Sequence, residues 1–157
     1  MAGLKRSAKK HMNTKNKFEY LFLLSIDPIH ADDEVQIDTI TDLLKQAPTS
    51  MTKKGQLMNG RPGEQGMRYD FWSWEYSSLT FDYASESKSL SERLLDFLKL
   101  FPKEEAVWDT IQQSFQCSIY LPVEKDHFQI EFDLSPEALG ALARRSIRLD
   151  ISTLSRD

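Results

Sequence analysis

Apolar residues gather in short runs along this chain, and their spacing predicts a strand and then a helix at the start of the fold. Residues 18–26, FEYLFLLSI, form a nearly continuous apolar run of strand length, which is typical of a buried strand. Residues 33–47 carry apolar side chains at helical spacing, behind the acids Asp32 and Asp33 that suit a helix cap and first turn. We therefore expect a buried strand followed by an amphipathic helix that ends before Pro48.

The most aromatic stretch, residues 67–83, alternates in a way that predicts a strand in the core. In an extended chain Trp72, Trp74 and Tyr76 point to one side, and smaller or polar residues point to the other. Residues 79–83 continue the alternation as a second short strand or an extension. A platform for stacking nucleic-acid bases needs basic residues between the rings, whereas acids flank them here. Base stacking is therefore disfavoured, while contact with a sugar or a protein remains open.

Capping and turn signals predict three more helices and a hairpin in the second half of the chain. Ser89 and Glu92 form a capping box ahead of a leucine-rich helix, and Pro102 opens a second short helix. The later elements are strands at 117–123 and 128–134 joined by a turn, a helix behind the cap Ser135, and a final strand at 147–151.

The order of these elements predicts an α+β fold for residues 18–157, which no linker or low-complexity segment divides. We expect a ferredoxin-like-type sandwich, with a largely antiparallel sheet of about five strands and helices on one face. Residues 1–17 are polar and basic without apolar periodicity, so we expect a disordered tail.

Residues 49–67 contain four glycines and one proline and show almost no apolar periodicity. A stretch of this length without secondary structure inside a compact domain is usually functional or disordered. A phosphate-binding loop needs a helix behind it, but a strand follows here, so an anion- or partner-binding loop and a solvated loop are the better alternatives. The candidate binding residues in and after this loop are Lys53, Lys54, Arg61, Arg68, Trp72, Trp74 and Glu75.

Charge is distributed unevenly over a chain whose net charge is −4. Six of the 20 Lys and Arg residues fall in residues 1–17, which contain no acid, so residues 18–157 carry 14 bases against 24 acids. The tail has three readings: vector or start-site origin ahead of Met12, a solvated native tail, or a nucleic-acid arm. The acidic remainder argues against nucleic acid as a partner and suits a basic protein.

No residue pattern supplies a catalytic, metal or cofactor site. The single cysteine, Cys117, excludes an internal disulfide, fits a reducing cytoplasm and lies in an apolar segment where a buried, inert thiol is expected. We expect the acids and the histidine of residues 27–34 to end a strand and cap the helix that follows, rather than to bind a metal ion. Glu75 and Asp82 are paired carboxylates in one interpretation and solvated strand residues in another. The longest apolar run, residues 20–24, is too short to span a membrane.

Several segments, taken in order, resemble one bacterial family. They are LLKQAPT at 43–49, the Lys54–Gly55 step, the Trp72–Ser73 step, and the ending FDLSPEALGALARRSIRLDI at 132–151. Together they resemble the family of the domain of unknown function 4279, over about Phe18 to Ser152. The resemblance implies a small cytoplasmic α+β domain with no assigned reaction, and the insertion-like residues 56–66 depart from it.

The sequence thus points to a non-enzymatic protein-binding module. Some small acidic α+β proteins in bacteria are immunity partners of secreted toxins, and an acidic body suits inhibition of a basic toxin. The alternative is a small-molecule or nucleotide-binding domain, with its pocket between the glycine-rich loop and the strand of Trp72 and Trp74.

Overall fold

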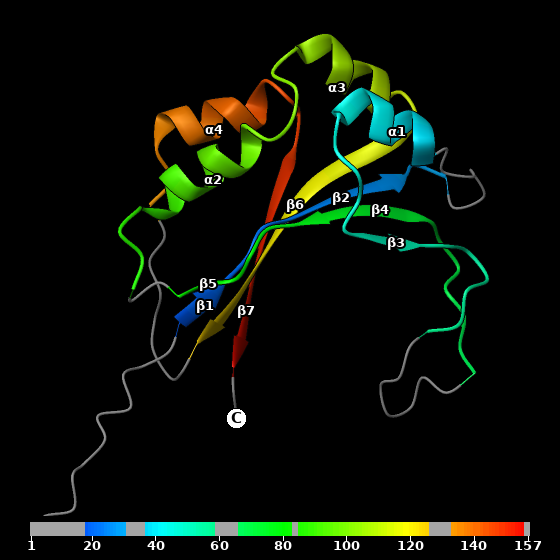
Figure 1. The fold of residues 1–157 in the computed structure, drawn as a ribbon, viewed down its shortest axis with the longest axis horizontal. Helices are drawn as coiled ribbons and strands as arrows, with labels where there is room; N and C mark the ends of the chain where they lie inside the picture. The colour runs from blue at the N-terminus through cyan, green and yellow to red at the C-terminus, as the bar shows by residue number, and fades with distance from the viewer. Residues whose placement is uncertain (1–17, 31–36, 59–65, 83–84, 126–132, 156–157) are drawn as a thin grey trace, which may run out of the picture.

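The helices that the structure describes all cover one face of a single sheet, and none of them lies on the other face (Figure 1). The computed structural model describes residues 18–30, 37–58, 66–82, 85–125 and 133–155, and these contain seven strands and four helices. The strands are β1 (Phe18–Tyr20), β2 (Leu23–Pro28), β3 (Ser50–Thr52), β4 (Ser73–Ser77), β5 (Phe81–Asp82), β6 (Phe115–Lys125) and β7 (Arg148–Ser155). The helices are α1 (Ile37–Leu44), α2 (Leu90–Leu98), α3 (Glu105–Gln112) and α4 (Pro136–Ala143).

The long strand β6 is the centre of the sheet, because it pairs with three other strands. Its first part pairs with β2, its last part pairs with β1, and β7 lies along its opposite edge. Beyond β2 and β1 come β4 and β5, and β3 pairs with β4 at the far edge. All pairs are antiparallel except β6 with β7, which α4 connects. The predicted class, α+β with a largely antiparallel sheet, is confirmed.

The sheet has seven strands rather than the predicted number of about five, because residues 18–26 form two strands, the aromatic segment forms two, and β3 lies in a stretch where no strand is expected. Residues 18–26 are expected as one strand, but β1 and β2 pair with β6 one after the other, with Leu21 and Phe22 between them. In the aromatic segment, β5 follows β4 as the second short strand that is one of the two alternatives expected at residues 79–83. The strand predicted at 128–134 falls mostly outside the described residues, and Asp133 and Leu134 are not in a strand.

The core lies between the sheet and the helices and is rich in aromatic rings. Trp74 of β4 and Trp108 of α3 are both fully buried. Phe97 of α2 lies with its ring centre 5.5 Å from that of Phe22 on the sheet side and 5.4 Å from that of Phe101. Edge-to-face and tilted ring pairs of this kind stabilise beyond the area they bury. The aromatic residues therefore join the sheet to α2 and α3.

Local sequence signals set the ends of two helices as predicted. The Ser89 side chain accepts from the backbone N–H of Glu92, and the Glu92 carboxylate accepts from the backbone N–H of Ser89, so the capping box is confirmed. The Ser135 side chain caps α4 by accepting from the backbone N–H of Ala138, with Pro136 in the first turn. The end of α1 before Pro48 agrees with its predicted stop, and its expected first residues lie outside the described part of the chain.

Truncation of Trp74 is expected to destabilise the fold strongly. Trp74→Ala removes a fully buried indole and leaves a cavity, so the free energy of unfolding should fall by about 3–5 kcal/mol in guanidinium denaturation. Leu79→Ala is the control, because Leu79 is 82% exposed and its loss should change stability by about 0.5 kcal/mol at most. Equal losses in the two variants would contradict the assignment of Trp74 to the core.

Candidate functional site

The face of the sheet away from the helices is lined by polar side chains. Directly opposite residues of neighbouring strands point to the same face, and successive residues of one strand alternate between faces. Buried residues such as Leu24, Ile26, Trp74 and Ile119 mark the helix side. The residues between them form a row across five strands of the other face: Ser50, Glu75, Ser25, Ser118 and Arg148. We call this side of the sheet the open face.

Carboxylates outnumber cations on the open face. By the same register, the charged side chains that the structure describes there are Glu19, Asp27, Glu75, Asp82, Asp150 and Arg148. The one arginine of this set is already neutralised, since Arg148 Nη2 lies 2.8 Å from Asp150 Oδ2. The described part of the open face therefore holds more carboxylates than cations.

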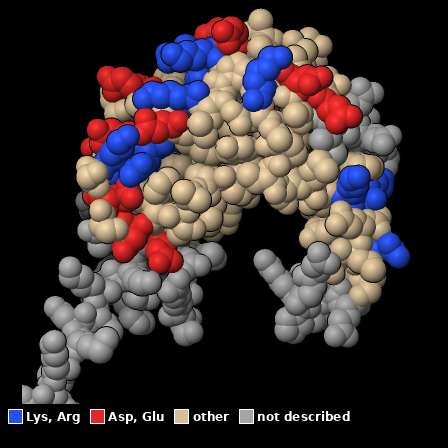
Figure 2. Space-filling model, viewed as in Figure 1, with Lys and Arg blue, Asp and Glu red and all other residues tan. Residues whose placement is uncertain are grey.

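Figure 2 shows that the molecule arches over a hollow, which lies below the sheet in that view. Acidic side chains lie at the lower end of the limb that holds the β1–β5 end of the sheet, and acidic and basic side chains alternate higher on that limb. The opposite limb is the connection between β3 and β4, and basic side chains lie on it. The hollow is thus bounded by an acidic end and a basic end.

A carboxylate and serine cluster lies in the middle of this face. Ser25 Oγ donates to Asp27 Oδ2 at 2.9 Å and lies 3.2 Å from Ser73 Oγ. Ser73 is 1% exposed, and both Ser73 and Ser50 hydrogen-bond to the Glu75 carboxyl group. These residues come from β2, β3 and β4, so only the pairing of the three strands brings them together.

Glu75 has a raised pKa in this cluster. Burial is the main cause, the negative charge of Asp27 adds to it, and the hydrogen bonds from Ser50 and Ser73 oppose it by favouring the ionised form. Among the described residues, no Lys or Arg lies within ion-pair distance of Glu75 or Asp27. A cation brought to this place by a partner would favour the ionised form of Glu75, so the cluster is suited to bind positive charge.

The stretch 49–67 is not structureless, contrary to the prediction, over the part that the structure describes. Residues 50–52 form β3, and backbone hydrogen bonds then join residues 55–58 to 67–69, with Gly55 N 2.8 Å from Tyr69 O and Met58 N 2.9 Å from Met67 O. Gly55 has a φ of +82°, which favours glycine at the turn after β3. The resulting projection, residues 53–58 with 66–69, is called the arm below.

The predicted basic residues lie on the arm as far as they are described. Lys53 and Lys54 are exposed at its turn, and Arg68 Nη1 donates to Gly55 O at 2.5 Å across the arm. Arg61 lies outside the described residues. The arm therefore holds at least three cations beside the hollow of the open face.

The structure separates the predicted aromatic and acidic members of the site. Trp74 is fully buried on the helix side of β4, where its Nε1 lies 3.3 Å from Thr41 Oγ1, whereas Glu75 lies on the open face. Trp72 lies before β4 and is half-buried against the core. Of these three residues, Glu75 alone belongs to the carboxylate and serine cluster.

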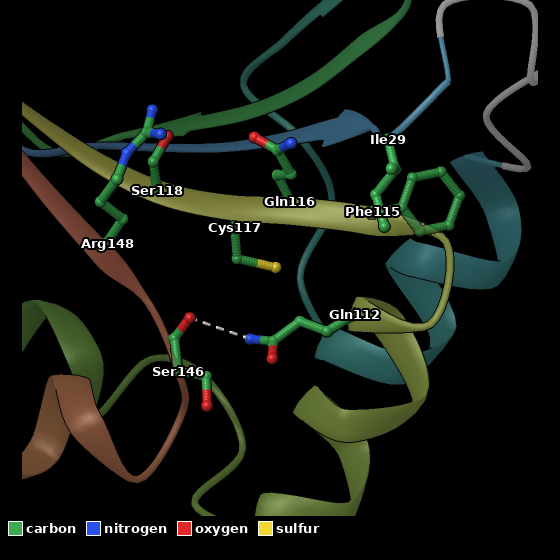
Figure 3. A pocket seen from close by; sticks show the side chains of 8 residues that line it. All are labelled: Ile29, Gln112, Phe115, Gln116, Cys117, Ser118, Ser146 and Arg148. Carbon is green, nitrogen blue, oxygen red and sulfur yellow. Dashed lines mark hydrogen bonds between the residues drawn. The ribbon is translucent and has the colours of Figure 1, made fainter.

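A hollow of about 320 Å³ at the start of β6 is lined by residues from both faces of the sheet (Figure 3). Gln116, Ser118 and Arg148 point to one side of β6, and Cys117 points to the other side, toward Gln112 and Ser146. Burial raises the pKa of the Cys117 thiol to about 12, so it is protonated at neutral pH and is a poor nucleophile. The prediction of a buried Cys117 is confirmed.

No group of three or more His, Cys, Asp or Glu residues is placed to hold a metal ion within the described part of the chain, and Asp32, Asp33 and Glu34 lie outside it. None of the four helices has the length and apolar content needed to cross a membrane.

Comparison with known proteins gives one match. The family model described as Domain of unknown function (DUF4279) matches residues 29–155, which is most of the chain. No curated protein and no solved structure matches the chain. The chain therefore belongs to the DUF4279 family, as the resemblance in its sequence indicates.

Titration of Glu75 should report the electrostatics of the open face. In a carbon-13 NMR titration we expect a pKa above 4.5 for Glu75, and a lower pKa in Asp27→Asn because a neighbouring negative charge is lost. Glu92 is the internal control, since its pKa is lowered by its hydrogen bonds to Ser89 and should not respond to Asp27→Asn. A Glu75 pKa that does not change in this variant would contradict the arrangement of the cluster.

The same shift predicts the pH dependence of stability. Because the folded state holds the Glu75 proton more tightly than the unfolded state, the free energy of unfolding should fall as pH rises from 4.5 through the folded pKa. Glu75→Gln removes the decrease in the free energy of unfolding that comes from ionisation of Glu75. In urea denaturation the variant should therefore gain stability relative to the native chain between pH 4 and pH 7. A constant difference over this range would contradict the shift.

Proposed function

We propose that this DUF4279 domain is a non-enzymatic module that binds a basic protein through the open face of its sheet. The class of partner that fits best is a basic toxin, which the domain would inhibit as an immunity-type protein in the bacterial cytoplasm. The observation that carries the proposal is the charge of the open face, where five described carboxylates accompany a single arginine that is paired with one of them.

Electrostatic complementarity favours such a partner in two ways. A surface lined by one sign of charge raises the association rate of an oppositely charged protein and discriminates against acidic ones. The half-buried Glu75 gains most from a partner cation, because its carboxylate is already partly desolvated and has no cation of the described chain beside it. A lysine or arginine placed between Asp27 and Glu75 would meet two carboxylates at once.

The arm supports a protein partner over a small ligand. It projects beside the hollow and carries Lys53, Lys54 and Arg68, so a partner that fills the hollow also meets a basic wall (Figure 2). A partner of one charge sign throughout would be repelled by one wall or the other. We therefore infer a partner with a basic patch for the sheet and a neutral or acidic patch for the arm.

We propose a non-enzymatic role because the candidate nucleophiles among the described residues are not activated. The Cys117 thiol is protonated at neutral pH, and the serines near Asp27 and Glu75 have no histidine or lysine beside them in this part of the chain. A serine nucleophile needs an adjacent base, such as a histidine or lysine, to take its proton.

We also infer a ferredoxin-like core that is extended at one edge. The order β3, β4, β2, β6, with α1 between β2 and β3 and with α2 and α3 before β6, supports this arrangement. In it, α4 and β7 form an additional unit parallel to β6. The addition places Arg148 and Asp150 at the border of the open face.

Partner capture with matched variants tests the proposal. The double variant Asp27→Asn/Glu75→Gln removes two charges from the open face with little change in shape, and Asp109→Asn/Glu137→Gln removes two exposed charges from the helices. Immobilised native chain and the helix variant should retain a basic protein from an extract of the native host, identified by mass spectrometry. The open-face variant should bind the purified partner with an association rate about tenfold lower. Equal binding by both variants, or capture of an acidic protein, would sink the proposal.

Partner affinity should also depend on pH through Glu75. A partner cation favours the ionised carboxylate, so binding lowers the Glu75 pKa and releases a proton. The affinity should therefore rise with pH from the pKa of the bound state up to that of the free state, as measured by calorimetry in two buffers of different ionisation enthalpy. In Glu75→Gln this rise should disappear, and its persistence would show that Glu75 does not meet the partner's cation.

A further inference from the structure

The helix side of the molecule contains a hollow lined by cations, on the opposite side of the sheet from the open face. It lies between α2 and α4, which pack against each other, and has a volume of about 260 Å³. Its apolar wall consists of Leu95 and Leu98 from α2 and Ala141 from α4. Its remaining lining is Lys99, Lys103, Arg144 and Arg145, with no carboxylate among the lining residues.

Arg145 is the unusual member of this set, because it is 5% exposed and has no ion-pair partner within the described part of the chain. Its Nη1 donates to Ala141 O at 3.0 Å and its Nε to Pro102 O at 3.3 Å, so two of its five N–H donors reach backbone carbonyls. No carboxylate lies within ion-pair distance among the described residues. Buried charges in proteins are normally paired, because taking an unpaired charge out of water is costly.

A neighbouring positive charge makes the buried charge of Arg145 still less favourable. Burial and the positive charge of Arg144 lower the pKa of Arg145, whereas Glu104 opposes the effect without forming an ion pair. Lys99 is held by Asp96, whose Oδ1 lies 2.9 Å from its Nζ, but Lys103 and Arg144 have no partner of this kind in the described chain. Among the described residues, none of these three cations therefore has an ion-pair partner, and Glu104 acts on Arg145 without contacting it.

We propose that this hollow binds a small organic anion, whose carboxylate or phosphate group meets Arg145, Arg144 and Lys103. The guanidinium of Arg145 is held by two carbonyls and is therefore preorganised, with donors left for a planar two-point contact. The apolar part of the ligand lies on Leu95, Leu98 and Ala141. The volume is slightly below the ~300–1,000 Å³ of pockets for drug-sized ligands, so the ligand is a small metabolite.

Binding is tested with phenyl phosphate and benzoate as probes, and with inorganic phosphate and acetate as their polar counterparts, at constant ionic strength. Nitrogen-15 NMR titration should give saturable shifts at α2 and α4 for at least one aromatic anion. That anion, at tenfold its Kd, should raise Tm by about 3–6 °C, since it binds the folded state alone. Whichever of phenyl phosphate and benzoate binds with the higher affinity shows whether the hollow prefers a phosphate or a carboxylate group. If neither binds, or if the polar counterpart binds as tightly, the proposal is overturned.

Variants then assign the residues. Lys103→Gln/Arg144→Gln should weaken binding of the aromatic anion at least tenfold, while Lys53→Gln/Lys54→Gln removes the same charge from the arm and should change it less than twofold. Arg145→Lys keeps the charge but loses the planar fork, so binding should also fall about tenfold. Equal losses in the hollow and arm variants, or full binding by Arg145→Lys, would overturn the assignment. Circular dichroism shows whether each variant is folded. If Arg145→Lys does not fold, the double variant of Lys103 and Arg144 still tests the proposal, because both side chains are exposed.

Discussion

The alternation of side chains along the strands is the constraint on which the rest of this structure depends. Four helices bury one face of the sheet, so every second residue of β2, β4 and β6 must be apolar and the residues between them are left to the other face. Trp74 and Glu75 show the result most sharply. They are neighbours in the chain, but one is part of the core and the other lies among serines and carboxylates on the open face.

A carboxylate-rich face and a hollow lined by cations lie on opposite sides of the sheet. No described helix packs on the open face, where carboxylates gather, and Lys103, Arg144 and Arg145 meet near the junction of α2 and α4 on the helix side. A net charge of −4 therefore describes neither surface. We propose a basic partner for the open face and a small organic anion for the hollow on the helix side, and the sheet lies between these two candidate sites.

Sequence reasoning identified the elements that depend on neighbouring residues. The capping box of Ser89 and Glu92, the cap at Ser135 and the inward alternation of Trp74 and Tyr76 are local patterns, and the structure bears each of them out. It placed Glu75 among the candidates but grouped it with Trp74, because residues of one segment are read together. The serines that surround Glu75 gave no signal, since serine is common in strands and loops alike.

The sequence by itself determined the class of fold, the family and the acidic character of residues 18–157, because composition and local periodicity carry that information. Only the tertiary structure decided which polar groups meet. Ser25 and Ser73 are 48 positions apart, and Arg145 reaches Pro102 across 43. Contacts at such separations follow from strand register and helix packing, and one sequence contains no local pattern that specifies either. The candidate sites of this protein therefore depend on strand pairing and helix packing, whereas its core follows from the alternation of apolar and polar residues along the strands.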